Sequence, residues 1–527
     1  MSRGAPYGGG WIPALSGALL ALAFPPFELL VPAFVGLAPF LAYCASLPGG
    51  PAGRRAAARG GWILGVAYYG ILLHWLAVAL AHVSRFAIPA YIVVVAGIAL
   101  FPAAVGAAFH LILERTRMPL ALAAAVVWTA MEWAQGHLGP FSFPWLGLGT
   151  ALAPYPRLAG AADLVGSGGL TFWLALVNGM AAGMIGWMGR SGGPRRPMVR
   201  AAVALAVTVA APAVYGAWRV ATLEMRAAAH VALIQPNVEP GVKRDRAIAV
   251  DSSMTALARL TRTIEPGSAD LVVWPEVAIP AVLDPGDEDG PIRQVRALAA
   301  GAGAPILAGA YGAGVEGSSR RYNSALLVRP EGDATAVYHK RRLVPFFEHI
   351  PLLPGAWAER VAARDGRYAS LLPGPPTPLP MAAGNTGFGV LICFESAFPE
   401  LARAQVNAGA EFLVSITNDA WFGGTRLLPR TGGFEQHAAH LAMRAMELRR
   451  GIARAANTGY SMVFDPLGRV HRRSALGEPA AYTAVAPTTD ERTLFARTGA
   501  WLPAACALAT AALLVAARGR GRRGVAI

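Results

Sequence analysis

The chain has 527 residues, of which 54% are hydrophobic and only 15% are charged, and its mean hydropathy is +0.43. This composition excludes an ordinary soluble globular protein, because such proteins carry about 25% charged residues. The net charge of +15 would fit a nucleic-acid partner, but basic loops beside a membrane produce the same excess.

Eight apolar stretches predict transmembrane helices, because each approaches the roughly 20 residues that span a bilayer. They lie near residues 11–30, 32–48, 61–82, 87–113, 119–136, 169–188, 200–219 and 497–517. Residues 11–24, followed by "FPPF", could instead be a cleaved signal peptide, although the apolar stretch continues past the small residues. The sequence therefore predicts spans within 1–221, one soluble α/β domain over 222–492, and a last span with a basic tail over 493–527.

The arginines indicate how these spans are oriented. Most occur in alternate connections, namely Arg3, Arg54, Arg55, Arg59, Arg115, Arg117, Arg190, Arg195, Arg196, Arg200, Arg518, Arg520, Arg522 and Arg523. The intervening short loops hold only Arg85 and Arg157. The positive-inside rule then places both termini in the cytoplasm and the large insert on the outer side of the membrane. This pattern accounts for the basic charge and argues against nucleic acid as a partner.

The three cysteines differ in context. Cys44 and Cys506 lie inside predicted spans, where we expect them only to pack. Cys393 has no cysteine partner in the insert, which leaves either a buried inert residue or a free thiol kept for chemistry. The run "FGVLIC" places it at the carboxyl end of a buried strand, just before an expected helix. A helix N-terminus at such a corner can lower the pKa of a thiol from about 8.5.

Polar residues also follow three other expected strands of the insert. Glu276 closes "LVVWPE", and Asn418 closes "FLVSITN". In "AVYHKRRLVPFFEHIPL" a strand ends at Tyr338, which places Lys340 and Glu348 on the loop that follows, where a lysine is ordinarily solvated. Each motif alone is weak. Together, in the order Glu, Lys and Cys within one α/β domain, they indicate a catalytic set.

These residues resemble the carbon–nitrogen hydrolase, or nitrilase, superfamily, and the membrane spans around them resemble the apolipoprotein N-acyltransferase family. The most specific segments are "WPE" (274–276), "YHKRRLVPFFEHIPL" (338–352), "CFES" (393–396), "TNDAWFG" (417–423), "MRAMELRRGIARAANTG" (443–459) and "EWAQGHLGPFSFPW" (132–145). The resemblance implies a multi-pass helical membrane bundle carrying an inserted αββα sandwich. The chain departs from the family at Phe347, usually Gly, at Phe394, often an aromatic hydroxyl, and at Arg244, commonly Trp.

The resemblance also implies a reaction. Cys393 would take an acyl chain from a membrane phospholipid as a thioester and pass it to the N-terminal amine of a diacylglyceryl-cysteine apolipoprotein. Glu276 would be the base, and Lys340 would stabilise the oxyanion. Glu348 would fix Lys340, or would be only a surface carboxylate, while Glu395 and Asn418 would support the pocket. Two further residues, Arg444 and Glu447, are spaced i and i+3 on an expected helix and predict an internal ion pair.

Other interpretations stay open at this point. The sequence shows no metal-ligand cluster and no phosphate-binding glycine loop, so we expect no cofactor and no metal. We also expect a monomer. Loops 351–374 and 420–433 could be lids that dip into the outer leaflet, or a surface for another protein. The alternative functions are a membrane-tethered nitrilase-type amidase and a binding or transport protein with an inactive domain. The few ionisable residues of the spans, chiefly His74, His110 and Glu132, argue against transport.

Overall fold

The computed structural model describes residues 10–82, 85–188, 195–238, 246–283, 290–314, 320–331, 336–353, 357, 359–360, 370–377, 380–423 and 431–519. The chain divides into two compact units. The helical unit comprises Met1–Thr222, Arg430–Ala439 and Thr498–Ile527, and the α/β unit comprises Leu223–Pro429 and His440–Arg497. The short segment Arg430–Ala439 therefore groups with the helices, although it lies within the polar insert of the sequence.

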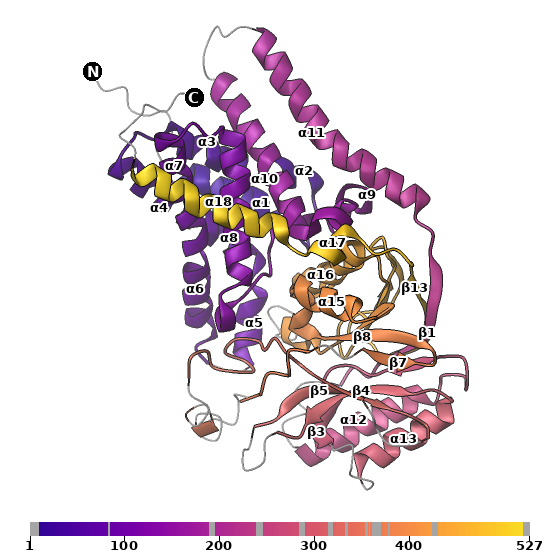
Figure 1. Ribbon diagram of the computed structural model, residues 1–527. Helices are drawn as coiled ribbons and strands as arrows, with labels where there is room; N and C mark the ends of the chain where they lie inside the picture. Colours follow the sequence, from indigo (N-terminus) through magenta and orange to yellow (C-terminus); the bar gives the residue numbers. More distant parts are fainter. Residues whose placement is uncertain are drawn as a thin grey trace. The chain divides into compact units, whose positions relative to one another are not determined.

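The helical unit is built from apolar helices of unequal length (Figure 1). They are α1 (Trp11–Ala21), α2 (Leu30–Val35), α3 (Ala38–Ser46), α4 (Pro51–Leu72), α5 (Trp75–Ala81), α6 (Ala87–Ile98), α7 (Leu100–Arg115), α8 (Leu120–Gly136), α9 (Pro156–Ala159), α10 (Ala162–Met188), α11 (Arg195–Thr222) and α18 (Trp501–Arg518). Among the described residues, four helical stretches are long and apolar enough to cross a membrane, or five if the bent pair α4 and α5 forms one span.

The expectation of about eight spans is thus met only in part. The first predicted span, 11–30, is helical only as far as Ala21, and the second, 32–48, is split between α2 and α3. Pro25 and Pro26 follow α1, and because proline has no backbone N–H, the helix cannot continue through them. The third, 61–82, bends by 63° between Leu72 and Trp75. Hydropathy reports apolar length but not these breaks, so the number of spans stays a prediction.

Two buried amides satisfy the backbone at these breaks. Asn178 of α10 accepts hydrogen bonds from Leu37 N (2.8 Å) and Ala38 N (3.2 Å), between α2 and α3. Its Nδ2 donates to the carbonyls of Ala33 (2.9 Å) and Leu174 (2.8 Å). The second amide is Gln436. Its Nε2 donates to the carbonyl of Pro25, which follows α1 (3.1 Å), and to that of Leu72, which ends α4 (3.0 Å). Its Oε1 accepts from the indoles of Trp75 and Trp145 (3.0 Å each). A broken helix in an apolar environment needs such partners.

The ionisable side chains inside the helical unit also have structural partners. Glu132 accepts from Trp128 Nε1 (2.7 Å), Leu148 N (2.8 Å) and Thr171 Oγ1 (2.6 Å), which joins α8 to the short 3₁₀ helix η2 (Leu148–Leu152) and to α10. His110 of α7 is buried, and its Nδ1 lies 3.0 Å from the carbonyl of Cys44. Cys44 and Cys506 are both buried, as predicted.

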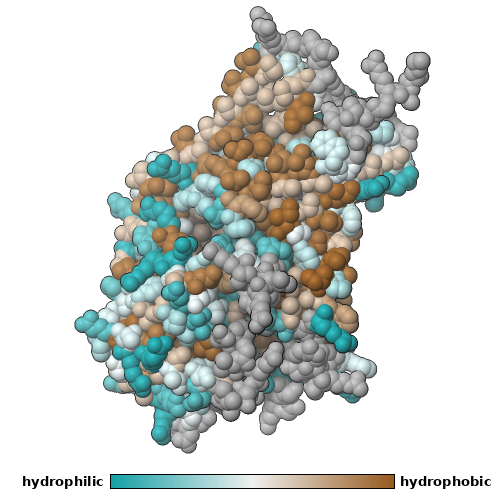
Figure 2. All heavy atoms as spheres, turned by 180° about the vertical axis from the view of Figure 1, so that it is seen from behind, coloured by the Kyte–Doolittle hydropathy of each residue, from teal (hydrophilic) through white to brown (hydrophobic). Residues whose placement is uncertain are grey.

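The outer surface of the helical unit is strongly apolar (Figure 2). In the apolar stretch of α11 none of the residues is buried. The exposed large hydrophobic residues of the unit include Val31, Ile88, Ile92, Val93, Leu100, Val199, Val203, Val207, Val214, Leu508 and Val515. Contiguous exposed apolar surface of this kind is what lipid, rather than water, covers.

The α/β unit contains two sheets. The first has seven strands, β1 (Arg226–Gln235), β2 (Leu271–Val273), β3 (Ile279–Leu283), β4 (Ile306–Gly312), β5 (Tyr322–Val328), β6 (Ala336–His339) and β13 (Ala480–Thr488). Its order is β13-β1-β2-β4-β5-β6, with β3 beside β4. The second has the order β12-β11-β10-β9-β8-β7. Its strands are β7 (Met381–Ala383), β8 (Thr386–Ile392), β9 (Phe412–Thr417), β10 (Ile452–Ala456), β11 (Met462–Phe464) and β12 (Val470–Arg473).

Helices cover the outer faces of the sheets. One core lies between the sheets and joins residues such as Val231 and Leu307 to Val390 and Val414. A second core lies between the seven-stranded sheet and helices α12 (Arg246–Thr261) and α13 (Pro291–Ala302). On the other sheet, α15 (Pro399–Asn407) packs against β8 and β9 (Figure 1). The predicted αββα sandwich is therefore confirmed. The helix α16 (Gly433–Leu448) begins in the helical unit and ends in the α/β unit.

Candidate active site

Cys393 lies at a sharp strand-to-helix corner. It directly follows β8, begins the 3₁₀ helix η4 (Cys393–Ala397), and is partly buried. Its φ of +53° lies in the left-handed region, which non-glycine residues rarely adopt. Strained backbone of this kind is concentrated at functional sites, where it turns a side chain out of a sheet. The position at the end of a buried strand agrees with the prediction.

Glu276 follows β2, on the turn that the "WPE" motif makes. Trp274 is fully buried and donates to Thr261 Oγ1 (3.1 Å), and Gly309 of β4 lies so close to the turn that a Cβ atom would stand 2.1 Å from Pro275 O. The next residue, Val277, has a φ of +46°, a rare conformation for a β-branched residue. Glu276 itself is 5% exposed. The closely packed turn thus fixes the position of the Glu276 carboxylate.

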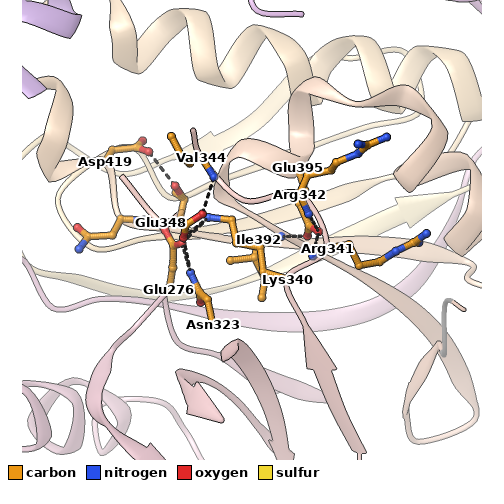
Figure 3. Close-up of polar contacts among 12 residues, drawn as sticks. Glu276, Asn323, Lys340, Arg341, Arg342, Val344, Glu348, Ile392, Glu395 and Asp419 are labelled. Atoms are coloured by element: carbon orange, nitrogen blue, oxygen red, sulfur yellow. Dashed lines mark hydrogen bonds and ion pairs between the residues drawn. The ribbon is translucent and has the colours of Figure 1, made fainter. Parts of the chain in front are cut away.

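Lys340 is buried, which corrects the expectation of a solvated loop lysine. It follows β6 and is 1% exposed. Its Nζ lies 3.1 Å from Glu276 Oε1 and 2.8 Å from Glu348 Oε1 (Figure 3). Burial alone would lower the pKa of Lys340, but the charges of Glu276 and Glu348 outweigh it and raise the pKa well above its ordinary value. The basic run "HKRR" does not indicate, from sequence alone, that the side chain of Lys340 is buried.

Glu348 and Asn323 complete this cluster. Asn323 of β5 donates through Nδ2 to Glu276 Oε1 (2.7 Å) and Glu348 Oε1 (3.1 Å). The other oxygen of Glu348 accepts from Val344 N (2.8 Å). The reading of Glu348 as a mere surface carboxylate is therefore wrong. Asn323 was missed from the sequence, because it belongs to no motif and sits inside an ordinary apolar strand, "YNSALLV".

The Cys393 thiol has a raised pKa, contrary to the expectation that a helix N-terminus would lower it. Burial is the main cause and the charge of Glu276 adds to it, while Lys340 and a hydrogen bond with Thr417 oppose it. The segment after Cys393 is only the 3₁₀ turn η4, and the longer helix α15 starts at Pro399. The thiol therefore needs a base close by in order to act as a nucleophile at neutral pH.

Glu395 connects the end of strand β8, beside Cys393, to the loop that carries Lys340. It is fully buried, and its oxygens accept from Tyr338 Oη (2.9 and 3.0 Å), Ile392 N (2.8 Å), Arg341 N (2.7 Å) and Arg342 N (3.3 Å) (Figure 3). Burial, opposed by these hydrogen bonds, raises the pKa of this carboxyl. Four donors on its two oxygens fix the chain on both sides of Lys340.

Asn418 and Asp419 follow β9, the strand next to β8. The backbone N–H of Asn418 donates to Glu276 Oε2 (2.9 Å), and its side chain accepts from Asn457 Nδ2 (3.1 Å). Asp419 is fully buried, accepts from Thr417 Oγ1 (2.9 Å), and forms an ion pair with Arg454 of β10. The pair Asp419–Arg454 was not anticipated, although the motif "TNDAWFG" pointed to the region.

The remaining predicted residues have varied outcomes. Arg444 and Glu447 form the predicted buried ion pair (2.6 Å). Phe347 packs edge-on against Trp421, with ring centroids 5.8 Å apart, and Phe394 packs against Phe398 at 5.0 Å. The departure at Arg244 lies outside the described residues. So does much of the two expected lids, 351–374 and 420–433.

No group of three or more His, Cys, Asp or Glu side chains that could hold a metal is present in the described part of the chain. The site instead combines a thiol, two carboxylates and an ammonium group. This combination is suited to acyl transfer through a covalent intermediate: a nucleophile, a base, and a positive charge for an oxyanion.

Comparison with known proteins identifies the family. Two family profiles match the chain, "Apolipoprotein N-acyltransferase N-terminal domain" over residues 16–180 and "Carbon-nitrogen hydrolase" over residues 230–488. The apolipoprotein N-acyltransferase of Geobacter metallireducens is 32% identical over 519 residues, which covers 95% of this chain and 94% of that protein. The chain belongs to the apolipoprotein N-acyltransferase family. The family member from Bradyrhizobium diazoefficiens is also 32% identical, over 98% of this chain and 96% of its own length.

Solved structures of nitrilase-superfamily proteins match about half of this apolipoprotein N-acyltransferase family member. An amidase mutant from Nesterenkonia AN1 is 22% identical and covers 49% of this chain and 90% of its own, with a TM-score of 0.35. Saccharomyces cerevisiae Nit3 is 18% identical, covers 49% of this chain and 89% of its own, and has a TM-score of 0.37.

Proposed function

We propose that this protein transfers an acyl chain from a membrane phospholipid, through a thioester on Cys393, to the N-terminal amine of a diacylglyceryl-cysteine apolipoprotein. The observation that carries the proposal is the cluster of Glu276, Lys340 and Glu348, two of whose charges act on Cys393, in a chain that matches apolipoprotein N-acyltransferases over 95% of its length. The strongly apolar surface of the helical unit supports a substrate that reaches the enzyme from a bilayer.

In the first half-reaction Glu276 takes the thiol proton as Cys393 Sγ attacks the ester carbonyl carbon of the phospholipid. Because the thiol pKa is raised, deprotonation accompanies attack and does not precede it. The carbonyl oxygen becomes an oxyanion, which the ammonium group of Lys340 stabilises. When the tetrahedral intermediate collapses, the bond to the lysophospholipid oxygen breaks and Glu276 returns its proton to that oxygen. A thioester remains on Cys393.

In the second half-reaction the same groups act on the acceptor. The N-terminal amine of the diacylated apolipoprotein loses a proton to Glu276 as its nitrogen attacks the thioester carbonyl. Lys340 again stabilises the oxyanion. The carbon–sulfur bond then breaks, an amide forms, and the thiolate of Cys393 recovers the proton from Glu276. No net proton or electron is gained or lost by the enzyme in the full cycle.

We assign supporting roles to three residues on the basis of their contacts. Glu348 holds Lys340 at 2.8 Å. Glu395 ties the backbone of the lysine loop to the strand that ends at Cys393. The backbone N–H of Asn418 holds one oxygen of Glu276 at 2.9 Å, so the other oxygen stays toward Lys340. None of the three needs to touch substrate in this scheme.

A membrane-tethered amidase would use the same residues with water as the acceptor. The likeness to apolipoprotein N-acyltransferases over almost the whole chain, helical unit included, favours an amine acceptor. The two schemes differ in the fate of the acyl-enzyme. We expect it to persist in water and to be discharged by a diacylated lipopeptide, whereas an amidase would hydrolyse it.

We further propose that the protein is a monomer in a bacterial inner membrane, with both termini in the cytoplasm and the α/β unit on the outer face. The arginine distribution supports this orientation. A reporter fused within residues 222–492 should register the outer side. Protease cleavage of that unit from the cytoplasmic side of sealed vesicles would contradict the orientation.

The test of the function is to incubate purified protein with phospholipid alone. We expect an acyl-enzyme that neutral hydroxylamine releases, and none in Cys393→Ala or Glu276→Gln. The chain offers matched controls, since Cys44→Ala and Cys506→Ala remove the two buried cysteines of the helical unit and should load normally. Transfer from phospholipid to lipopeptide without any acyl-enzyme in rapid-quench samples would show direct transfer and refute the mechanism.

A further inference from the structure

Glu276, Lys340, Glu348 and Asn323 form a closed ring of hydrogen bonds in which donors and acceptors alternate (Figure 3). Around the ring, Glu276 Oε1 lies 3.1 Å from Lys340 Nζ, which lies 2.8 Å from Glu348 Oε1. Glu348 Oε1 lies 3.1 Å from Asn323 Nδ2, which lies 2.7 Å from Glu276 Oε1. Asn323 is the uncharged member of the ring.

The distances pair the four groups in a definite way. The shorter of the two ring contacts of Glu276 comes from Asn323 (2.7 Å) and not from Lys340 (3.1 Å). For Glu348 the order is reversed, with Lys340 at 2.8 Å and Asn323 at 3.1 Å. We propose that Asn323 is a positioning residue of the general base, in addition to the backbone N–H of Asn418, and that it keeps Glu276 Oε1 in place when Lys340 turns toward the oxyanion.

The orientation of the amide is fixed by the charges around it. Asn323 is 2% exposed, and both carboxylate contacts are made by its nitrogen. If the amide were flipped, its oxygen would face two carboxylate oxygens, which would be repulsive. Its main-chain oxygen accepts from Lys340 N (2.8 Å), so the same residue also fixes the backbone that carries the ammonium group.

A count of hydrogens explains why an uncharged donor is useful here. The ammonium group of Lys340 has three hydrogens, and two of them are directed at Glu276 and Glu348. Oxyanion stabilisation requires at least one hydrogen to face the reacting carbonyl. Asn323 supplies each carboxylate with a second donor, so neither loses all of its ring contacts when Lys340 moves toward the substrate.

This inference rests on the proposed acyl transfer and adds a residue to it. Because Glu276 acts as base in both half-reactions, Asn323→Ala should slow thioester formation and discharge to the lipopeptide by similar factors, about 10- to 100-fold, as expected for a lost hydrogen bond to a charged group. The KM for phospholipid should stay unchanged. A carboxylate that has lost a donor binds a proton more tightly, so the acidic limb of the rate profile should move to higher pH.

A second variant separates positioning from packing. Asn323→Asp has nearly the same volume but places oxygens against Glu276 and Glu348, so positioning predicts that it is slower than Asn323→Ala. A packing role predicts the opposite order, because alanine leaves a cavity. Asn323→Ser retains a hydroxyl donor and should recover part of the rate. Ser324→Ala is the matched control, because Ser324 is the next buried residue of β5 and its hydroxyl contacts His339 Nδ1 (2.7 Å) instead of the ring.

The decisive experiment measures acyl-enzyme formation against pH for the wild type and these four variants, with a thermal unfolding scan of each. An unchanged pH profile for Asn323→Ala, or Asn323→Asp faster than Asn323→Ala at equal folded fraction, would overturn the inference. If the wild type itself forms no thioester, the proposed function fails. If the wild type forms the thioester and Asn323→Ala forms it at the same rate and with the same pH profile, only the role of Asn323 fails.

Discussion

Asn178 in the helical unit and Asn323 in the α/β unit are both buried amides, yet their partners differ. All four hydrogen bonds of Asn178 are made with backbone groups, three of them in α2 or at the junction of α2 and α3 and the fourth within its own helix, α10. Asn323 directs its nitrogen at two carboxylates that also share the ammonium group of Lys340. The first arrangement replaces backbone partners that the fold has lost. The second places two carboxylates against one ammonium group, so the charges in it do not cancel.

Two more polar side chains of the helical unit show the same contrast, although this unit also holds one buried ion pair, Arg219–Asp163 (3.1 Å). In the helical unit, Gln436 and Glu132 are saturated by neutral donors and carbonyls. In the α/β unit, two carboxylates face one ammonium group, and Cys393 itself has the strained, left-handed backbone conformation. Because an uncompensated buried charge is costly, a cluster that retains one indicates function more strongly than a saturated polar group does.

The largest expected effect comes from removing the shared cation. Lys340→Met should lower acyl-enzyme formation by about 10²- to 10³-fold or more, because it removes an oxyanion donor. It should also destabilise the α/β unit by about 3–5 kcal/mol, because Glu276 and Glu348 would remain buried without their counter-ion. A solvated loop lysine would cost little stability when replaced, but Lys340 is buried, so this loss is expected.

Loading assays and thermal unfolding of Lys340→Met check both parts. In the matched double variant with Glu348→Gln, one of the two orphaned charges is removed, so part of the stability should return while the activity stays low. Wild-type stability in Lys340→Met would mean that the cluster does not depend on the ammonium charge. The cluster would then not differ from the neutral polar groups of the helical unit.

Lys340 also shows where sequence analysis reached its limit. Strand ends are visible as apolar runs, so Glu276, Cys393 and Asn418 could be placed, and the family resemblance implied the sandwich. Burial of a lysine within "YHKRR" and the role of Asn323 in "YNSALLV" depend on contacts between distant strands, which no local pattern encodes. The helix breaks after Ala21 and Val35 were missed because hydropathy averages over them.

The second prediction concerns Asp419 and Arg454, a fully buried pair that the sequence did not reveal. Arg454→Met should destabilise the α/β unit by about 3–5 kcal/mol, because a buried carboxylate would lose its partner. Adding Asp419→Asn should recover much of that loss, since both charges are then gone. Urea unfolding of the two variants measures the difference. Equal losses in the single and double variants would show that packing, not charge, holds this pair.

The third prediction tests the saturated amides. Asn178→Leu keeps the number and branching of the side-chain heavy atoms but leaves the N–H groups of Leu37 and Ala38 and a carbonyl without partners. We expect a loss of about 1–3 kcal/mol in stability, because buried polar groups that lose a partner carry that cost. Thioester formation per folded molecule should not change, since Asn178 has no part in the chemistry. A loss of thioester formation in a variant of wild-type stability would contradict a purely structural role for Asn178.

The smallest effect is expected where charges face water. Arg226 at the start of β1 pairs with Glu411 (2.6 Å) and Asp490 (2.8 Å), but its side chain is 45% exposed and that of Asp490 is 82% exposed. Solvent screens such pairs, so Arg226→Ala should cost less than about 1 kcal/mol, and the cost should shrink further in 1 M salt. Thermal unfolding at low and high salt measures both quantities. A loss as large as that of Arg454→Met, or one that salt leaves unchanged, would mean that exposure does not distinguish the ion pairs of this unit. Burial would then be no measure of how much the charges of the Lys340 cluster contribute to stability.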